Sequence, residues 1–293
     1  EYAKKCSADL LLATDPDCDR VGIAVPNREG EYVLLSGNET GLLLLNYICS
    51  MRQAAGTMPE HPVFVKTIVT MDMAARIAAD YGVKTVDVLT GFKFIGDQIA
   101  RLEAEGREND YILGFEESYG YLSGSYVRDK DAVDGAFLIC EMAAYYRSKG
   151  MGLLEVLEGL YEKYGFCLNT LHSYEFEGME GFEKMKGIMN RLHTMASRIA
   201  EGEAVCIGGR KTEAVEDYLS GTISRADKTT EPIAGLPSSD VLKFRLAGNA
   251  SVVVRPSGTE PKLKLYISVS AEDKGKAQAE EEKITAQMEE CFL

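Results

Sequence analysis

The middle of the chain alternates short apolar runs with longer stretches whose apolar positions repeat at helical spacing. This alternation predicts βαβ units, in which a parallel or mixed sheet is covered by helices. The predicted strands are residues 63–69, 84–89 and 111–115. The predicted helices are residues 41–55, 72–81, 94–105, 133–149 and 153–164, and Asp72 is the expected N-cap of the second.

The segment before this alternation has a different pattern. Residues 8–13, 21–25 and 32–35 each predict a short strand, and the first of these is expected to end at Thr14. No helix is predicted within the segment. A β-rich opening of this kind indicates the tail of a domain whose beginning lies outside the sequence.

After Gly165 the pattern changes from α/β to α+β. Polar stretches that contain glycine and proline, such as residues 224–240, separate the elements there. We therefore place a domain boundary near residue 166. The predicted strands are residues 169–176, 241–246, 251–254 and 263–269, and the predicted helices are residues 181–200 and 272–291.

Length and composition fit several domains. A chain of 293 residues is long enough for about two or three, and 45% hydrophobic with 27% charged residues is an ordinary globular balance. The formal net charge of −14 argues against nucleic acid or an anionic membrane as the main partner, because both favour a basic face. A local basic pocket can still bind a phosphorylated substrate.

Three further features indicate a cytoplasmic protein. The longest strongly apolar stretch, residues 41–49, is far shorter than the roughly 20 residues that a membrane helix needs. No apolar signal-peptide segment follows the first residues. The seven cysteines are scattered and include no Cys-x-x-Cys pair, which favours reduced thiols over a disulfide framework.

Three carboxylates follow the first predicted strand, in the run Asp-Pro-Asp-Cys-Asp-Arg. Asp15, Asp17 and Asp19 can converge only if the backbone wraps around a point, and a divalent cation such as Mg²⁺ then relieves their repulsion. The adjacent Arg20 is placed to hold a phosphate whose other oxygens the metal neutralises. An EF-hand is disfavoured, because it needs glycine at residue 20 and glutamate where Pro26 stands.

Two alternatives to this metal site remain open. A haloacid-dehalogenase-type phosphatase also places an Asp-x-Asp pair after an apolar strand, but it usually has threonine or valine where this chain has Asp19. A solvated acidic turn, stabilised by aspartate capping, would need no ligand.

A carboxylate and a hydroxyl follow the last strand of the alternating region, in the run Gly-Phe-Glu-Glu-Ser-Tyr-Gly. Ligand sites in α/β sheets usually lie at such strand ends. Glu116 and Ser118 are two residues apart and can face the same way, toward neighbouring sugar hydroxyls. The flanking glycines allow the backbone to approach a ligand closely.

Three cations near this loop are weaker candidates. Arg128 and Lys130 alternate with two aspartates, an arrangement that suits a phosphosugar but equally suits surface ion pairs. Lys93 ends the run Thr-Gly-Phe-Lys just before a predicted helix. It could bind phosphate or act as an acid or base, and an exposed lysine at a helix start is the alternative.

A third loop joins two strands near the end of the chain, in the run Arg-Pro-Ser-Gly-Thr-Glu-Pro-Lys. Backbone N–H groups in such a turn can form an anion-binding concavity, and arginine can bind two phosphate oxygens at once. Lys262 and Lys264 are expected on one face of the following strand, where both would border the same anion. A plain hairpin turn is the alternative. The candidate residues are Arg255, Ser257, Gly258, Thr259, Lys262 and Lys264.

The order and chemistry of these loops together resemble the α-D-phosphohexomutase family. The resemblance implies that the acidic run is a Mg²⁺ loop, that Gly-Phe-Glu-Glu-Ser selects the sugar and that Arg-Pro-Ser-Gly-Thr-Glu-Pro-Lys holds the distal phosphate. Implied metal ligands are Asp15, Asp17 and Asp19; implied sugar contacts are Glu116 and Ser118; implied phosphate contacts are Arg255, Ser257, Gly258 and Thr259; and Arg20 and Lys93 are implied catalytic residues.

The resemblance also implies an architecture. Residues 1–37 would end the second of four domains, residues 38–166 would form a complete α/β third domain with a mixed sheet, and residues 167–293 would form an α+β fourth domain. The segments Ser-Gly-Asn-Glu and Val-Arg-Asp-Lys-Asp are most similar to the phosphoglucomutase-2/phosphopentomutase branch. Implied ligands are Mg²⁺, sugar phosphates and glucose 1,6-bisphosphate, with the protein a monomer or weak dimer.

One departure from the family pattern concerns the nucleophile. The family uses a serine that cycles through phosphoserine, in a Thr-Ala-Ser-His-Asn-Pro type segment, and no Ser-His dipeptide occurs here. We therefore expect a C-terminal fragment of a phosphoglucomutase that binds ligand but does not turn it over. Phosphopentomutase, phosphomannomutase, a non-catalytic sugar-phosphate-binding protein and a phosphatase with Asp15 as nucleophile are the alternatives.

Overall fold

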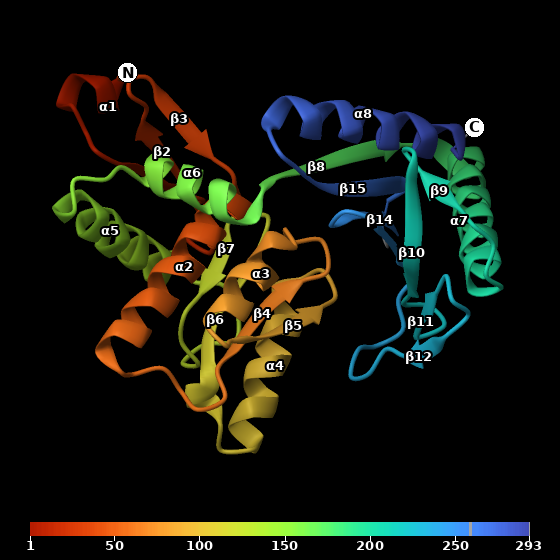
Figure 1. The fold of residues 1–293 in the computed structure, drawn as a ribbon, viewed down its shortest axis with the longest axis horizontal. Coiled ribbons are helices and arrows are strands. Elements are labelled where there is room, and N and C mark those ends of the chain that lie inside the picture. The colour runs from red at the N-terminus through yellow and green to blue at the C-terminus, as the bar shows by residue number, and fades with distance from the viewer. Residues whose placement is uncertain (258–259, 293) are drawn as a thin grey trace. The chain divides into compact units, whose positions relative to one another are not determined.

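The computed structural model describes residues 1–257 and 260–292. The chain divides into two compact units, Glu1–Tyr164 and Gly165–Leu293, and each is described here by itself (Figure 1). The further division into residues 1–37, 38–166 and 167–293 stays a prediction. Among the described residues, no helix combines the length and apolar character needed to cross a membrane.

Unit 1 opens with a short helix, α1 (Tyr2–Cys6), so the prediction of a helix-free opening is wrong. The helix buries only Ala3 and ends at Ser7, which adopts a left-handed conformation. Five residues are too few to show helical periodicity in the sequence. An antiparallel three-stranded sheet follows, with the order β1 (Leu11–Thr14), β2 (Val21–Pro26), β3 (Tyr32–Leu35).

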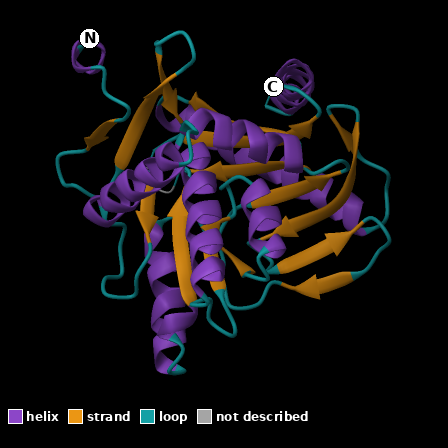
Figure 2. Cartoon of the chain, turned by 60° about the vertical axis from the view of Figure 1, so that its left-hand side comes forward, coloured by secondary structure: helices purple, strands orange, loops and turns teal. Residues whose placement is uncertain are grey.

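The four-stranded sheet of unit 1 has the order β5-β4-β6-β7. Strand β4 pairs in parallel with β5 and β6, whereas β7 is antiparallel to β6, so the predicted mixed sheet is confirmed. Figure 2 shows the helices lying alongside the strands. The strands are β4 (Val63–Thr67), β5 (Lys84–Val88), β6 (Tyr111–Glu116) and β7 (Gly120–Leu122). The helices are α2 (Gly37–Ala55), α3 (Met73–Asp80), α4 (Phe92–Ala104), η1 (Glu108–Asp110), α5 (Ala132–Ser148) and α6 (Leu153–Tyr164).

Helix α2 begins four residues earlier than predicted, because a capping box sets its start. The Ser36 side chain accepts a hydrogen bond from the Glu39 N–H, and the Glu39 carboxylate accepts one from the Ser36 N–H. Asp72 precedes α3 as predicted, but its side chain makes no capping hydrogen bond. It pairs instead with the ammonium of Lys66, at 3.0 Å.

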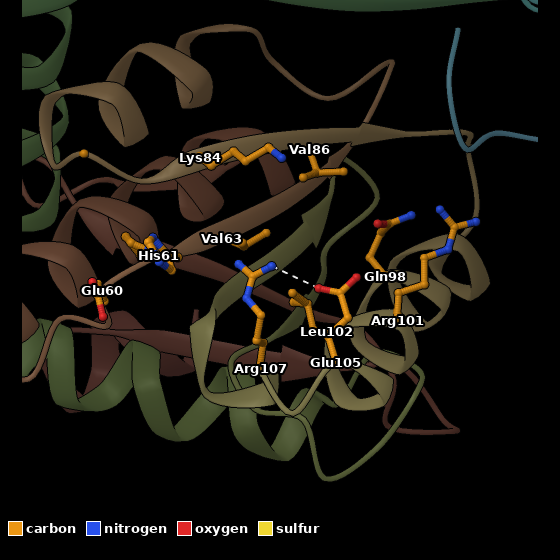
Figure 3. A pocket seen from close by; sticks show the side chains of 12 residues that line it. Glu60, His61, Val63, Lys84, Val86, Gln98, Arg101, Leu102, Glu105 and Arg107 are labelled. Carbon is orange, nitrogen blue, oxygen red and sulfur yellow. Dashed lines mark hydrogen bonds and ion pairs between the residues drawn. The ribbon is translucent and has the colours of Figure 1, made fainter.

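A pocket of about 810 Å³ opens where the parallel strands β4 and β5 begin. Lys84, Arg107 and Glu105 line it, and Arg107 Nη1 lies 3.0 Å from Glu105 Oε2 (Figure 3). The loop with the predicted sugar contacts Glu116 and Ser118 lies at the opposite, carboxyl end of the sheet, where β6, which is parallel to β4, ends. This pocket is therefore separate from the predicted site.

Unit 2 contains an antiparallel sheet with the order β12-β11-β10-β13-β14-β15-β8. The strands between residues 206 and 232 were not predicted, because they are short or carry many polar side chains. The strands are β8 (Phe166–Glu175), β9 (Cys206–Ile207), β10 (Arg210–Asp217), β11 (Thr222–Arg225), β12 (Thr230–Pro232), β13 (Leu242–Leu246), β14 (Ala250–Pro256) and β15 (Lys262–Ala271). The helices are α7 (Gly178–Ala200) and α8 (Lys274–Glu290).

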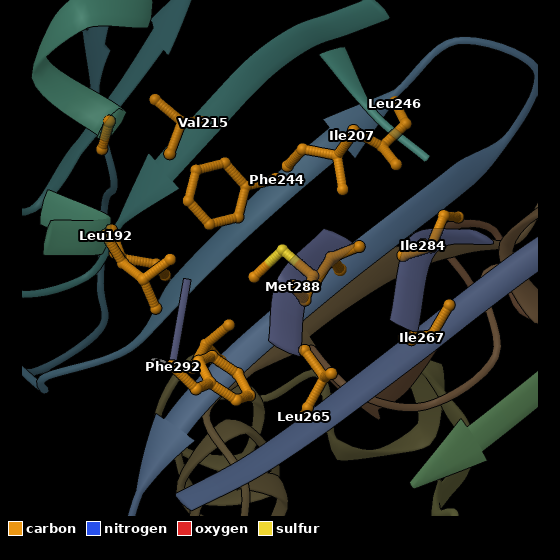
Figure 4. Packing of buried hydrophobic residues seen from close by; sticks show 14 of the residues in the cluster. Leu192, Ile207, Val215, Phe244, Leu246, Leu265, Ile267, Ile284, Met288 and Phe292 are labelled. Atoms are coloured by element: carbon orange, nitrogen blue, oxygen red, sulfur yellow. The ribbon is translucent and has the colours of Figure 1, made fainter. Parts of the chain in front are cut away.

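One face of this sheet holds the core of unit 2. Phe244, Leu265 and Ile267 point from the strands toward Leu192 of α7 and Met288 of α8 (Figure 4). All five side chains are almost fully buried. Burial of apolar surface between the sheet and these helices supplies the main stabilisation of the unit.

A polar network interrupts this apolar face between β8 and α8. The buried carboxylate of Glu281 accepts hydrogen bonds from Thr170 at 2.6 Å, His172 at 2.6 Å and Thr285 at 3.0 Å. Burial raises the pKa of Glu281, but these hydrogen bonds outweigh it and the net pKa is lowered. Glu281 is therefore ionised near neutral pH and ties α8 to β8.

Replacing Glu281 by glutamine is expected to lower the free energy of unfolding at neutral pH by about 1–3 kcal/mol, because a buried charged acceptor is lost. The pKa of Glu281 is lower in the folded state than its unfolded-state value, near 4.5, so its ionisation stabilises the fold at pH values above 4.5. This contribution is lost as the pH falls through the folded-state pKa. The difference between wild type and Glu281→Gln should therefore shrink below about pH 4.5. Urea denaturation over a pH series measures it.

The matched control is Glu282→Gln, since Glu282 is the exposed neighbour on the same helix. It should change the free energy of unfolding by less than about 0.5 kcal/mol. Equal effects of the two substitutions, or a Glu281→Gln difference that persists in acid, would show that the network does not stabilise unit 2.

Candidate functional site

The acidic loop between β1 and β2 brings three carboxylates together. Oxygens of Asp15, Asp17 and Asp19 all lie within 4.8 Å of one another. Asp15 Oδ1 accepts hydrogen bonds from the backbone N–H groups of Asp19, at 3.1 Å, and Arg20, at 3.0 Å. Cys18 adopts a positive φ of 58°, which lets the chain turn back at this point. The predicted wrapping of the backbone around a point is therefore present.

The free oxygens of this loop fit a divalent cation. Asp19 Oδ1 is buried and has no hydrogen-bond partner among the described residues, while Asp19 Oδ2 lies 2.6 Å from Lys130 Nζ. Octahedral Mg²⁺, with Mg–O distances of about 2.1 Å, holds neighbouring ligands about 3 Å apart and opposite ligands about 4.2 Å apart. The oxygens of Asp15, Asp17 and Asp19, all within 4.8 Å of one another, are close to such spacings. An unpartnered buried carboxylate oxygen is the atom such an ion would stabilise.

Lys130 lies beside both the acidic loop and the predicted sugar loop. A Cβ atom on Gly120 would lie 2.7 Å from Lys130 Cδ and 3.1 Å from Glu116 Oε1, so these side chains flank the same glycine. Burial raises the pKa of Glu116, while a hydrogen bond with Ser118 and the charges of Lys130 and Arg20 oppose this rise. The structure thus brings Glu116, Ser118 and Lys130 to the acidic loop.

Backbone hydrogen bonds fix the acidic loop against its neighbours. The Val21 N–H donates to the Tyr119 carbonyl at 3.1 Å, and the Ala132 N–H donates to the Cys18 carbonyl at 3.1 Å. Asp131 then caps α5 through the N–H groups of Val133 and Asp134. The acidic loop is therefore connected to the sugar loop and to the start of α5, although it is far from both in the sequence.

Arg128 and Lys93 are not shown to join this cluster. The guanidinium of Arg128 pairs with Glu103 of α4 and donates to the carbonyl oxygens of Ser125 and Val127. Lys93 is exposed in the first turn of α4, with its Nζ 4.9 Å from the centre of the Phe94 ring. Their roles as substrate-binding and catalytic residues stay predictions.

In unit 2, two predicted phosphate-binding cations lie side by side. Arg255 of β14 is paired in register with Lys264 of β15, which is in turn opposite Ser173 of β8. Cross-strand partners share a face of a sheet. Arg255 and Lys264 are partly exposed and Ser173 is exposed, and all three lie on the face opposite the apolar core that contains Leu263 and Leu265.

The turn between these strands is closed by its own backbone. The Ser257 N–H donates to the Lys262 carbonyl at 2.7 Å, and the Glu260 N–H approaches Ser257 Oγ at 3.4 Å. Lys262 Nζ pairs with Glu175 at 2.8 Å and Glu260 at 3.5 Å, and these carboxylates raise the pKa of Lys262. The predictions for Gly258 and Thr259 fall outside the described residues.

Two stretches of the chain match models of one family. Residues 36–164 match the alpha/beta/alpha domain III of phosphoglucomutase/phosphomannomutase, and residues 208–285 match the C-terminal domain of the same proteins. Together these matches cover most of the chain. The chain belongs to the phosphoglucomutase/phosphomannomutase family. The resemblance inferred from the three loops is therefore confirmed.

Individual relatives agree with this assignment. The chain is 39% identical over 273 residues to a phosphoglucomutase of Staphylococcus aureus strain MRSA252. The aligned region covers 93% of this chain and 47% of that protein. It thus spans about half the length of the curated relatives it matches. Two solved structures share the fold. The phosphoglucomutase parafusin from Paramecium superposes with a TM-score of 0.65 and is 17% identical in sequence. The match covers 97% of this chain and 45% of the parafusin chain.

The second is the Aspergillus fumigatus N-acetylphosphoglucosamine mutase, solved in complex with GlcNAc-6P and magnesium. It has a TM-score of 0.55 and 14% identity, with coverage of 100% of this chain and 52% of its own. At these identities the two structures support the fold alone.

Sequence reasoning missed a set of residues behind the sugar loop. Lys66 is fully buried in β4 and lies 3.0 Å from both Asp72 and Asp87. Burial acts to lower the pKa of Lys66, but the two aspartates raise it above its usual value. A signal was available, since a lysine inside the otherwise apolar run Val-Phe-Val-Lys-Thr rarely stays unpaired.

Replacing Asp19 by asparagine is expected to weaken Mg²⁺ binding by about 10-fold or more, because an anionic oxygen ligand becomes a neutral amide. Isothermal titration calorimetry of the 293-residue chain with MgCl₂ measures the dissociation constant. Asp97→Asn is the control, because Asp97 is an exposed aspartate on α4, outside the acidic loop. If both variants bind Mg²⁺ as the wild type does, the acidic loop is a solvated turn rather than a metal site.

Proposed function

We propose that this chain carries the metal-, sugar- and phosphate-binding loops of a phosphohexomutase that interconverts glucose 1-phosphate and glucose 6-phosphate. The observation that carries the proposal is the cluster in unit 1, where Asp15, Asp17 and Asp19 converge beside Lys130 and the buried Glu116. This cluster combines a cation site with a cationic side chain and a carboxylate suited to hydroxyl groups. Family membership makes a sugar phosphate the natural ligand.

The residues of unit 1 would bind the metal ion and the phosphate group that is transferred. Asp15, Asp17 and Asp19 would hold Mg²⁺, which when bound neutralises charge on a transferring phosphoryl group. Arg20, half of whose side chain is exposed, can contact phosphate oxygens at the rim of the acidic loop. Lys130 adds a second positive charge at the opposite side of Asp19.

Glu116 is suited to bind sugar hydroxyls, because its burial favours hydrogen bonding over solvation. Ser118, which hydrogen-bonds with Glu116, supplies a hydroxyl that can donate or accept. A raised carboxyl pKa also makes Glu116 a better acceptor for weakly acidic hydroxyl donors.

Unit 2 supplies a different part of the proposed ligand set. Arg255 and Lys264 present two adjacent cations beside the Ser257 turn, an arrangement suited to a phosphate dianion. No Ser-His dipeptide occurs in these 293 residues, so the proposal assigns ligand binding, and not the phosphoserine nucleophile, to this chain.

The proposal extends to the setting of the protein. We propose Mg²⁺ and glucose 1,6-bisphosphate as its ligands, sugar phosphates as its substrates, a cytoplasmic location and a monomer or weak dimer. One structural neighbour was solved in complex with GlcNAc-6P and magnesium, and another in complex with glucose 1,6-bisphosphate. All seven cysteines are free in the structure, which agrees with a reducing compartment.

Binding of glucose 1,6-bisphosphate to the 293-residue chain, in MgCl₂, tests the proposed function. Arg255→Ala is expected to raise the dissociation constant about 10- to 100-fold, because a charge-assisted hydrogen-bond donor to phosphate is lost. The matched control is Arg225→Ala, which removes a partly exposed arginine paired with Glu231 in the same unit and should leave binding unchanged. Isothermal titration calorimetry provides the measurement.

The same preparation separates the mutase proposal from a phosphatase. With glucose 1-phosphate as substrate, a coupled assay should detect no glucose 6-phosphate, and a phosphate assay should detect no release. Steady phosphate release that disappears in Asp15→Asn would support a phosphatase with Asp15 as nucleophile. Absence of bisphosphate binding in the wild type would contradict the proposed function directly.

A further inference from the structure

Glu117 lies between the two predicted sugar contacts but turns to the other side of the loop. Its Oε2 lies 3.3 Å from Thr67 Oγ1, at the end of β4, and 3.5 Å from Thr70 Oγ1, in the segment that follows β4. Its neighbour Glu116 instead lies beside Lys130, close to the acidic loop. The carboxylates of Glu116 and Glu117 thus lie on opposite sides of one loop.

The two threonines are well suited to hold a carboxylate. Both are buried, and their hydroxyl oxygens are 2.9 Å apart. Two hydroxyl groups carry two protons between them, and the carboxylate of Glu117 can only accept when it is ionised. Both hydroxyl groups can therefore donate to Glu117 directly, or Thr70 can donate to Thr67 while Thr67 donates to Glu117.

The segment that carries these threonines is itself held firmly. The ammonium of Lys66 donates to the Thr70 carbonyl at 3.1 Å while it pairs with Asp72 and Asp87. The Met71 N–H donates to Asn38 Oδ1, at the start of α2, at 3.0 Å. Buried charged networks of this kind resist displacement, because breaking one contact leaves a charge uncompensated.

The backbone around Glu117 is equally confined. Gly37 packs so closely that an added Cβ atom would overlap the Glu117 carbonyl oxygen and lie 2.7 Å from the Tyr119 nitrogen. The Tyr121 hydroxyl donates to the Gly37 carbonyl at 3.1 Å. With its backbone against α2 and its side chain tied to β4, Glu117 has little freedom to move.

We propose that Glu117 is a positioning residue for sugar recognition. Held by the hydroxyls of Thr67 and Thr70, it fixes the backbone from which Glu116 and Ser118 project. This inference rests on the proposed function. It adds that the geometry of the sugar contacts is set from behind the loop, by the end of β4 and the segment after it. Displacements of about 1 Å in such groups are enough to impair recognition.

The test compares two ligands, glucose 1,6-bisphosphate and the sugar-free hexane-1,6-diol bisphosphate, by calorimetry on the 293-residue chain in MgCl₂. Glu117→Ala should raise the dissociation constant for the sugar ligand about 10-fold. It should change that for the sugar-free ligand, and for Mg²⁺ alone, less than about 2-fold. A merely structural role would weaken all three to a similar extent, so that outcome would overturn the inference.

A double-mutant cycle with Thr67→Val tests the contact itself. Thr67→Val removes one hydroxyl with little change of shape, and the double variant should bind the sugar ligand no more weakly than Glu117→Ala alone. Additive losses would show that Thr67 does not act through Glu117. Glu162→Ala, an exposed glutamate on α6, is the matched control and should bind both ligands as the wild type does.

Glu117→Gln keeps the experiment decisive if Glu117→Ala does not fold. The amide oxygen of the new glutamine can accept a hydrogen bond from one threonine hydroxyl. Glu117→Gln alone should therefore weaken sugar binding less than the double variant Glu117→Gln/Thr67→Val does. If the wild type binds neither bisphosphate, the proposed function and this inference fall together. If the wild type binds the sugar ligand and the Glu117 variants match it, the inference alone is wrong.

Discussion

Electrostatic repulsion among the carboxylates of the acidic loop is the constraint on which the site in unit 1 depends. Asp15, Asp17 and Asp19 can share one small region only because other groups offset their charge. Two backbone N–H groups do so at Asp15, and Lys130 does so at Asp19. The loop can take this shape because β1 and β2 hold its ends and the start of α5 holds its turn.

A second layer of charge lies deeper in the same unit. Lys66 with Asp72 and Asp87 connects the ends of two parallel strands to the segment that follows them. Parallel strands place all their carboxyl-end loops at one edge of the sheet, where each loop would otherwise move on its own. In this unit the loops that carry the predicted ligand contacts are joined through side chains, and Glu117 continues that connection to the sugar loop.

Much of this arrangement could be predicted from the sequence, and the reasons are local. The strand Tyr32–Leu35 is a continuous apolar run and the helix Leu153–Tyr164 has apolar positions at helical spacing, and both are predicted to the residue. The convergence of Asp15, Asp17 and Asp19 followed from spacing and repulsion alone. The short helix Tyr2–Cys6 and the strands between residues 206 and 232 were missed, because length and polar composition removed the periodic signal. Glu117 could not be assigned, because its partners Thr67 and Thr70 are fifty and forty-seven residues away.

The contact between Lys130 and Asp19 also sets how much negative charge the acidic loop carries. An ammonium lies 2.6 Å from one carboxylate, so the chain itself neutralises part of that charge. The other oxygen of the same carboxylate, Asp19 Oδ1, is buried and has no hydrogen-bond partner among the described residues. A cation bound there under the proposed function would meet a partly neutralised set of ligands, and less repulsion would oppose the approach of the three carboxylates.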